Sequence, residues 1–371
     1  MRVPRGPPIE DSTCCSGEAE KSVRDCNRGY LSVVRAQSED ATSAESTPTH
    51  RALADLPTGR YLLAVSGGRD SMALLDAMHR WRRSEIAAVA TFDHGTGAAA
   101  RRAAALVART AEERELPVVT GILGAGEERT EAAWRAARWK FLNAWAAEFG
   151  ARVITAHTRD DQIETVVLRI LRGSGARGLA GMLDGGSSIA GGPTPPARPF
   201  LTLSRAAIAE YASARRVPFV EDPSNVSSAH QRNRVRHDLL PALETAVPGF
   251  GAWCWQLSER ASTVRATLET AVDQLAPSRN ADGAVVVRAG PLNGLTAEGW
   301  GALWPALAAR AGVVMDRRGI ERAAEWAPHA APGAAIPLTG GASIVRTAVT
   351  FVIRASPPGT TLGSDDYILK A

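Results

Sequence analysis

Residues 61–75 read YLLAVSGGRDSMALL, and in this stretch the turn SGGRDS separates two apolar runs. The first run has the length of a buried strand, and the second carries apolar residues at helical spacing. A glycine-rich turn between a strand and a helix directs backbone N–H groups and the positive end of the helix dipole to one place, where anions bind. The stretch therefore predicts either a phosphate-binding loop or a plain strand-to-helix turn capped by Ser71.

The side chains of this turn favour a phosphate site that includes a metal ion. Gly67 and Gly68 let the backbone approach an oxygen atom without a Cβ in the way, and the hydroxyls of Ser66 and Ser71 can donate to phosphate. The Gly-Lys-Ser/Thr ending of a Walker A loop is missing, and Asp70 stands where that loop would have a cation. Because carboxylate and phosphate repel each other, the sequence implies Mg²⁺ at Asp70.

Composition indicates a globular chain of ordinary make-up. The 371 residues are 45% hydrophobic and 22% charged, and no window approaches the roughly 20 apolar residues of a membrane span. No secretory signal is evident, so we expect a cytoplasmic protein without a membrane partner. The formal charge of +4 suits a polyanionic partner without establishing one. The four cysteines include no CxxC pair, so neither a zinc site nor a disulfide framework is indicated.

Short apolar runs alternate with amphipathic segments after residue 60. This alternation predicts an α/β fold with a Rossmann-like parallel sheet and helices on both faces. In such sheets ligands bind beyond the carboxyl ends of the strands, where SGGRDS, DHG (93–95) and AHTRDDQIET (156–165) are expected. The predicted strands are 61–65, 86–92, 116–123 and 152–156, and the predicted helices between them are 71–81, 98–115 and 131–149.

Acidic residues open the helix expected after the fourth strand. Asp161 and Glu164 are three residues apart and share a face, whereas Asp160 points elsewhere. Two carboxylates on one face can hold an ammonium group or a metal ion. They can equally complement the N-terminus of the helix and complete a capping arrangement, so the local sequence leaves both interpretations open.

Two histidines follow predicted strands at the same sheet edge. They are His94, directly after Asp93, and His157. A single histidine is more often structural than catalytic. Two beside a candidate nucleotide site modestly favour a functional role.

Arginines recur at helical spacing in two further segments. Arg135 and Arg138 share one face of a predicted helix, and Arg232 and Arg236 share another, with Asn233 nearby. Guanidinium groups suit phosphates and RNA backbones. A solvated helix face is an equal alternative for them.

Several motifs, taken in order, resemble tRNA(Ile)-lysidine synthetase, a family of the PP-loop (N-type ATP pyrophosphatase) superfamily. SGGxDS alone indicates only the superfamily, whereas LRGSGARGLAGM and the EDPSN and RNRVRH block indicate this family. The resemblance covers roughly residues 60–250. The motifs are AVSGGRDSMALL, FDHG, EAAWRAARWKFL, AHTRDDQIETVVLRILRGSGARGLAGM, RPFL, EDPSN and RNRVRHDLLPALE.

The resemblance implies a ligase that acts on the wobble cytidine of a tRNA(Ile) with a CAU anticodon. ATP would adenylate the 2-oxo group of the cytosine with release of pyrophosphate, and the ε-amine of L-lysine would then displace AMP. The product, lysidine, changes codon reading from AUG to AUA. The implied cofactors are ATP and Mg²⁺, the implied partners are this tRNA and L-lysine, and a homodimer is left open.

The resemblance also implies roles for individual residues. Asp70, Arg135, Asp161 and Glu164 would be catalytic, with Asp70 on Mg²⁺, Asp161 and Glu164 on lysine, and Arg138 beside Arg135 on phosphate. The tRNA would approach Arg232, Asn233 and Arg236. The expected ATP-binding residues are Ser66, Gly67, Gly68, Arg69, Asp70, Ser71, Asp93, His94 and His157.

The chain departs from the family pattern after DHG, where Thr96 and Gly97 replace the usual Leu-Arg. A basic side chain is therefore missing there, and Arg101 or Arg102 could take its place. Two rival functions remain. A PP-loop tRNA thiolase generally needs cysteines near its site, and a non-catalytic RNA-binding relative would have no reason to keep Asp70 in an anion cradle.

The resemblance and the composition together divide the chain into four parts. Residues 1–50 have six Lys or Arg against eight Asp or Glu and no apolar period, so we expect a disordered extension or a mis-assigned start. Residues 55–215 are expected to form the PP-loop ATP-binding catalytic domain. Residues 216–275 form a helical connector, and residues 276–371 form a small α+β domain that binds tRNA and ends in a short tail.

Overall fold

A computed structural model describes residues 47–95, 97–123, 130–183, 194–221 and 231–355 of the chain. Residues 1–46 of the expected extension (1–50), Thr96, and residues 222–225 of the EDPSN segment lie outside these ranges. Residues 48–50 of the same expected extension are helical. The first helix of the described residues, α2 (Pro48–Ala54), precedes the sheet.

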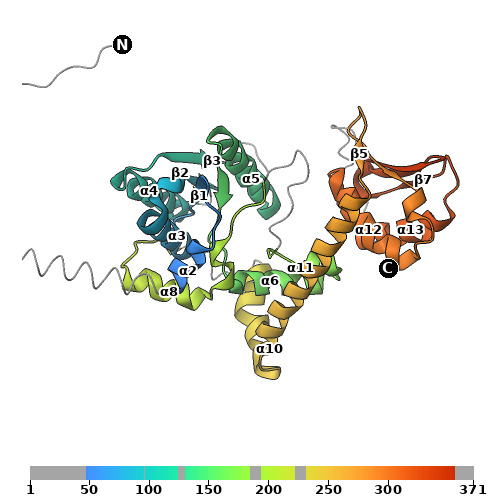
Figure 1. The fold of residues 1–371 in the computed structure, drawn as a ribbon. Coiled ribbons are helices and arrows are strands. Elements are labelled where there is room, and N and C mark those ends of the chain that lie inside the picture. The colour runs from blue at the N-terminus through green and yellow to red at the C-terminus, as the bar shows by residue number, and fades with distance from the viewer. Residues whose placement is uncertain (1–46, 96, 124–129, 184–193, 222–230, 356–371) are drawn as a thin grey trace, which may run out of the picture. The chain divides into compact units, whose positions relative to one another are not determined.

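Four parallel strands form the first sheet, in the order β3-β2-β1-β4 (Figure 1). They lie where the alternation of apolar and amphipathic segments predicts them, so the parallel sheet is confirmed. Their bounds are β1 (Tyr61–Ala64), β2 (Ile86–Asp93), β3 (Val118–Ile122) and β4 (Arg152–Ile154).

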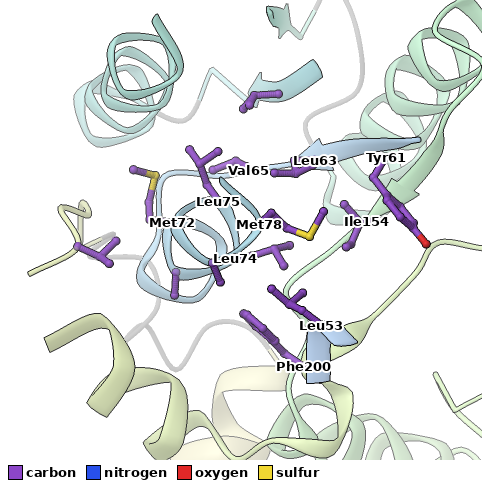
Figure 2. Packing of buried hydrophobic residues seen from close by; sticks show 14 of the residues in the cluster. Leu53, Tyr61, Leu63, Val65, Met72, Leu74, Leu75, Met78, Ile154 and Phe200 are labelled. Atoms are coloured by element: carbon purple, nitrogen blue, oxygen red, sulfur yellow. The ribbon is translucent and has the colours of Figure 1, made fainter. Parts of the chain in front are cut away.

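Helices cover both faces of this sheet. Successive side chains of a strand point to opposite faces, so neighbouring residues of β1 pack against different helices. Leu63 and the following Val65 belong to a buried cluster that includes residues of α3 (Arg69–Arg82) and α4 (Ala98–Glu113). Figure 2 shows Leu63 and Val65 beside the α3 side chains of this cluster. Leu62 belongs to a second cluster, with side chains of α5 (Glu131–Glu148). The expected helices on both faces are therefore confirmed.

Shorter helices follow the sheet and lead to a long one, α11 (Phe250–Gln274). α11 contributes Cys254 to a buried cluster with Val166 and Val235, and it contributes Val272 to the core of the C-terminal region. The helices between β4 and α11 are α6 (Arg159–Leu171), α7 (Ala176–Leu179), α8 (Arg205–Ala214), α9 (Gln231–Arg234), the π-helical turn η4 (Val235–Leu239) and α10 (Leu240–Ala246).

The C-terminal region combines a second, antiparallel sheet with two helices, which agrees with the small α+β region that the sequence predicts. Its core includes Trp300 and Trp304, whose ring centroids are 4.9 Å apart, and Phe351, which meets Trp304 edge-on at 5.4 Å. The sheet order is β5-β6-β9-β8-β7. The elements are β5 (Ser278–Arg279), β6 (Val285–Arg288), α12 (Ala297–Arg310), α13 (Arg317–Trp326), β7 (Ala335–Pro337), β8 (Ser343–Arg346) and β9 (Thr350–Arg354).

Within the described ranges, no helix is long and apolar enough to cross a bilayer. The division of the chain into a catalytic domain, a connector and a tRNA-binding domain stays a prediction.

Candidate active site

The SGGRDS turn joins β1 to α3 at the carboxyl end of the parallel sheet. Gly67 has a φ of +82°, in the left-handed region that favours glycine. A Cβ at this position would also lie only 2.8 Å from the Cβ of Ala103 in α4. The turn therefore requires glycine at position 67 on two counts, its backbone conformation and the closeness of α4.

The two serines of the turn have different roles. The Ser71 hydroxyl donates to the Gly68 carbonyl at 2.9 Å and accepts the Ser66 N–H at 3.1 Å. The two serine hydroxyls lie 3.2 Å apart. Ser71 is buried and holds the turn together, whereas Ser66 is exposed. A ligand would therefore meet the Ser66 hydroxyl first.

The turn borders two cavities. The smaller cavity measures about 160 Å³ and is lined mainly by small and apolar side chains of the sheet and α4, among them Ala90 and Phe92. The larger cavity measures about 640 Å³ and is more polar. The lining of the larger cavity includes Arg69, Asp70, His157, Arg205 and Arg236. Both cavities are lined by Ala64, Ser66, Gly68, Arg138 and Val220.

Asp70 presents a carboxylate to the larger cavity. Its Oδ1 lies 3.4 Å from Arg69 Nε, and 26% of its side chain is exposed. Burial raises the pKa of Asp70, and the nearby guanidinium groups of Arg69 and Arg205 only partly oppose that effect. A carboxylate whose charge is insufficiently compensated in this way attracts a further cation.

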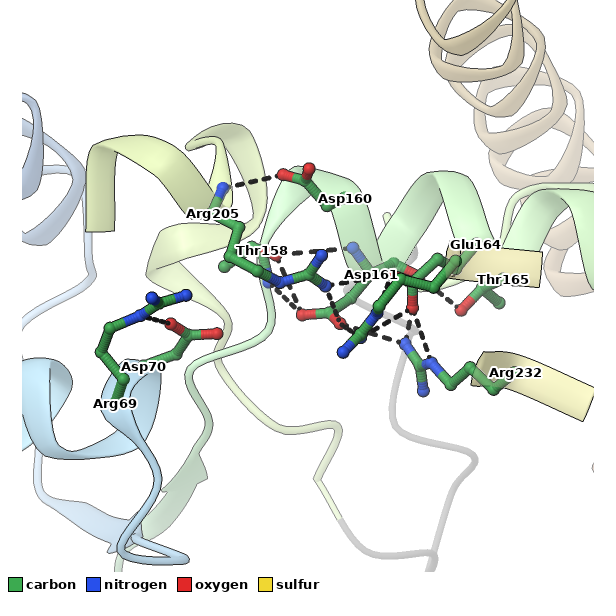
Figure 3. Close-up of polar contacts among 10 residues, drawn as sticks. Arg69, Asp70, Thr158, Asp160, Asp161, Glu164, Thr165, Arg205 and Arg232 are labelled. Carbon is green, nitrogen blue, oxygen red and sulfur yellow. Dashed lines mark hydrogen bonds and ion pairs between the residues drawn. The ribbon is translucent and has the colours of Figure 1, made fainter. Parts of the chain in front are cut away.

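Asp161 and Glu164 lie side by side on α6, as their spacing predicts, and three arginines bind them (Figure 3). Glu164 Oε1 accepts from Arg205 Nη2 at 3.0 Å and from Arg236 Nε at 2.6 Å. Glu164 Oε2 accepts from Arg232 Nε at 2.8 Å and from Arg236 Nη2 at 3.0 Å. Asp161 Oδ1 accepts from the Nη2 atoms of all three arginines, at 3.0 Å from Arg205 and 3.3 Å from the other two.

These ion pairs keep the two carboxylates charged although they are buried. The side chain of Glu164 is 1% exposed and that of Asp161 is 13% exposed. Burial alone would raise the pKa of Glu164, but the hydrogen bonds and charges of Arg236 and Arg232 outweigh it and lower that pKa. Burial is likewise outweighed at Asp161, chiefly by Arg232, and its pKa is also lowered.

The same acidic residues begin the helix. Thr158 and Asp161 form a capping box, in which Asp161 Oδ2 accepts the Thr158 N–H at 2.8 Å. Asp160 points away from Glu164, and its Oδ2 accepts the backbone N–H of Arg205 at 2.7 Å. Capping and charge pairing therefore coexist at Asp161, because its two carboxylate oxygens serve different partners.

The two predicted histidines lie at different cavities. His157 lines the larger one, and its Nδ1 is 2.9 Å from Thr155 Oγ1. Burial lowers the pKa of His157 to about 3, so the ring is neutral at physiological pH. His94 lines the smaller cavity, where burial and Arg138 lower its pKa. Asp93 accepts the Gly95 N–H at 2.8 Å and does not line either cavity.

The predicted arginines also differ in which cavities they line. Arg138 lines both cavities, whereas Arg135 on the same helix is exposed and lines neither. Arg236 lines the larger cavity, but Arg232 and Asn233 are not among the residues that line it.

Arg205 is the residue of the site that sequence reasoning missed. It is the first residue of α8, where Ser204 caps the helix by accepting the Ala207 N–H. A cation at a helix N-terminus opposes the helix dipole. The position of a cation at the first residue of a helix was therefore the signal in the sequence that Arg205 pairs with acidic side chains of another element. In the structure these are Asp161 and Glu164.

Comparison with known proteins places the chain in a family. The family model for the PP-loop domain matches residues 42–243. The chain is 33% identical over 290 residues to a tRNA(Ile)-lysidine synthase of Parasynechococcus marenigrum, with 76% of this chain and 84% of the relative covered. It is 38% identical over 243 residues to one of Rhodopseudomonas palustris, with 63% and 68% covered.

A solved structure of a U34-tRNA thiolase from Methanococcus maripaludis is also similar, with a TM-score of 0.48 at 15% identity. That match covers 58% of this chain and 78% of the thiolase. The PP-loop family model matches more than half of the chain, and the Parasynechococcus marenigrum relative is 33% identical over 84% of its own length. These two matches show that this chain belongs to the tRNA(Ile)-lysidine synthase family of PP-loop proteins.

Proposed function

We propose that the chain ligates L-lysine to the wobble cytidine of a tRNA(Ile) with a CAU anticodon, with ATP converted to AMP and pyrophosphate. The observation that supports it best is that Ser66 and Gly68 of one turn line both cavities. A nucleoside triphosphate that places its base in the smaller cavity can therefore place its phosphates at the turn. The larger cavity then receives the cytosine, and lysine reaches Asp161 and Glu164 from it. These two acids do not line the cavity themselves, but Arg205 and Arg236 of its wall contact them.

The smaller cavity suits an adenine base. Its lining includes four alanines of α4, which leave room for a flat ring, and the ring of Phe92. Largely apolar linings with a few polar groups are typical of small-molecule and cofactor sites. The neutral ring of His94 and the guanidinium of Arg138 lie among the polar groups of this lining.

The residues at the turn fit Mg²⁺ held jointly by protein and nucleotide. The described part of the chain contains no group of three His, Cys, Asp or Glu side chains that could cage a metal ion. Mg²⁺ commonly uses one or two carboxylates and completes its shell with water and substrate phosphates. Asp70, on the wall of the larger cavity, is the carboxylate that we propose for it. The ion, when bound, would neutralise phosphate charge.

The arginines of the larger cavity support the first step. A cytosine oxygen is a poor leaving group, and adenylation converts it into a good one. That step releases pyrophosphate, whose charge is stabilised by fixed cations. Arg138, Arg205 and Arg236 line the cavity where this charge would develop.

Asp161 and Glu164 are proposed to bind and orient lysine in the second step. Their pKa values are lowered, so both stay ionised and can attract an ammonium group. For the same reason they are weak bases, as is His157 with its pKa of about 3. Their contribution is therefore the placement of lysine rather than the removal of its proton.

Sulfur transfer is less well supported. Cys254 is the one cysteine within the described ranges, and it is fully buried. Burial raises the pKa of its thiol to about 11, so it is a poor nucleophile at neutral pH. A persulfide carrier needs an accessible thiolate.

The proposal is tested with purified chain, ATP, Mg²⁺, labelled L-lysine and a tRNA(Ile) transcript with a CAU anticodon. We expect label in the tRNA together with release of pyrophosphate. The matched control is the same transcript with uridine at the wobble position, which should stay unlabelled. Labelling of the control to the same extent, or sulfur incorporation without lysine, would refute the proposal. A homodimer and a cytoplasmic location stay predictions, and sedimentation velocity decides the first.

A further inference from the structure

The proposed lysine site is already filled with positive charge. Two carboxylates, Asp161 and Glu164, face three guanidinium groups, and the cluster has one more positive charge than negative. Glu164 alone accepts four hydrogen bonds, two on each oxygen. An ammonium group added to this arrangement would find its acceptors occupied and a surplus of like charge beside it. Lysine can bind there only if one arginine leaves.

The three arginines differ in how easily each can release Asp161 and Glu164 when a ligand binds. Arg205 is fixed at two points, because its backbone N–H donates to Asp160 while its Nη2 bridges Asp161 and Glu164. Arg232 also holds the backbone, since its Nη2 lies 3.3 Å from the Asp161 carbonyl, and it does not line the larger cavity.

Arg236 differs from both in its position. Among the described residues, its side chain donates to the two carboxylates alone, and it lines the larger cavity. It also lies in the π-helical turn η4. A π-helical turn inside a helix is a local irregularity often found at functional sites, and a change to α-helical pairing reorients its side chains.

We propose that Arg236 occupies the place of the lysine ε-ammonium and gives it up when lysine binds, an inference that rests on the proposed function. The exchange keeps three cations around two carboxylates, so the charge balance of the buried cluster does not change. Arg205 and Arg232 stay in place and hold the carboxylates for the incoming ammonium group. Arg236 and the lysine ε-ammonium therefore compete for the same two carboxylates.

The released guanidinium has a second partner available. Arg236 and the Ser66–Ser71 turn line the same cavity, where the pyrophosphate part of the nucleotide is proposed to lie. An arginine released from Glu164 can form a charge-assisted pair with a phosphate there. Lysine binding and phosphate binding then strengthen each other, because each favours the same position of Arg236, and by linkage the effect is reciprocal.

The first test measures binding of labelled L-lysine to the full chain by equilibrium dialysis, without ATP or tRNA. If Arg236 occupies the site in nine-tenths of unliganded molecules, Arg236→Gln should bind lysine about tenfold more tightly. Arg232→Gln is the matched control, because it removes the same charge from the same carboxylates, and Arg232 is not among the residues that line the cavity. It should not tighten lysine binding. Unchanged or weaker binding in Arg236→Gln, or equal tightening in both variants, would overturn the proposal.

A second measurement separates competition from a general effect on folding. Pyrophosphate with Mg²⁺ should tighten lysine binding several-fold in the unsubstituted chain and have no such effect in Arg236→Gln. Equal coupling in both proteins would exclude Arg236 as the link. If the unsubstituted chain neither binds lysine nor forms lysidine, the proposed function itself is wrong. If it does both but Arg236→Gln gains no affinity, only the role of Arg236 is wrong.

Discussion

One nitrogen of Arg205, Nη2, lies 3.0 Å from both Asp161 Oδ1 and Glu164 Oε1, so a single donor atom bridges the two acids of α6. The backbone N–H of the same residue donates to Asp160 at 2.7 Å. The first residue of α8 thereby fixes the first turn of α6, although more than 40 residues separate them in sequence.

Replacing Arg205 with glutamine should destabilise the fold and weaken lysine transfer. Glu164 is 1% exposed and would lose one of three cations, so we expect the free energy of unfolding to fall by about 1–3 kcal/mol. Urea denaturation measures the change. The control is Arg215→Gln at the C-cap of the same helix, since Arg215 is 39% exposed and pairs with Asp76 at 3.4 Å. It should cost less than about 1 kcal/mol. Equal losses would contradict the special position of Arg205.

The two glycines of the turn should respond differently to alanine. Gly67→Ala should lower the free energy of unfolding by about 1–3 kcal/mol because its φ of +82° and the closeness of Ala103 both oppose a Cβ. Gly68→Ala should cost under about 1 kcal/mol, since the nearest atom to its Cβ, Ser66 Oγ, is 3.7 Å away. Because Gly68 lines both cavities, its alanine variant should still bind ATP more weakly. Thermal unfolding and nucleotide titration distinguish the two effects.

Asp70→Asn should abolish pyrophosphate release without destabilising the protein. Burial raises the pKa of Asp70, which means that the fold disfavours its charge, so a neutral amide should leave the melting temperature equal or higher. Asp76→Asn gives the contrast. Asp76 accepts from Arg114 at 2.7 Å and from Tyr211 at 2.8 Å, and losing its charge should cost about 2–4 kcal/mol. A large drop in melting temperature for Asp70→Asn would show that its role is structural.

The buried His157 should make folding stability depend on pH. Its pKa is lowered from 6.5 to about 3 by burial, so between these values the unfolded chain binds a proton that the folded chain does not. The contribution is fully present above pH 6.5 and is lost as the pH falls toward 3, by at most about 1.4 kcal/mol per pH unit. Urea unfolding at a series of pH values should show a shallower loss for His157→Gln. Parallel curves for the two proteins would mean that the ring is already accessible to protons.

The sheet and its ligand-binding edge could be predicted because local patterns determine them. Apolar runs of strand length alternate with helical periods, and the left-handed backbone that favours glycine at position 67 is a property of one turn. The strand β5 has only two residues, too few for a pattern to show.

The partners of the site residues could not be predicted in the same way. The spacing of Asp161 and Glu164 places them on one face, but Arg232 and Arg236 reach them from 68 to 75 residues away. Likewise, the spacing of Arg135 and Arg138 predicts a shared face without showing which of them is directed at the cavities. Such choices depend on packing between elements that are distant in sequence.

The helix α11 contributes Cys254 to one buried cluster and Val272 to another, which contains Trp304 and Phe351. The two clusters have no residue in common, but one continuous helix contributes to both. The ratio of the van't Hoff enthalpy to the calorimetric enthalpy therefore measures how strongly α11 couples their melting. A ratio of one means that both clusters unfold together, and a lower ratio means that they unfold in separate steps.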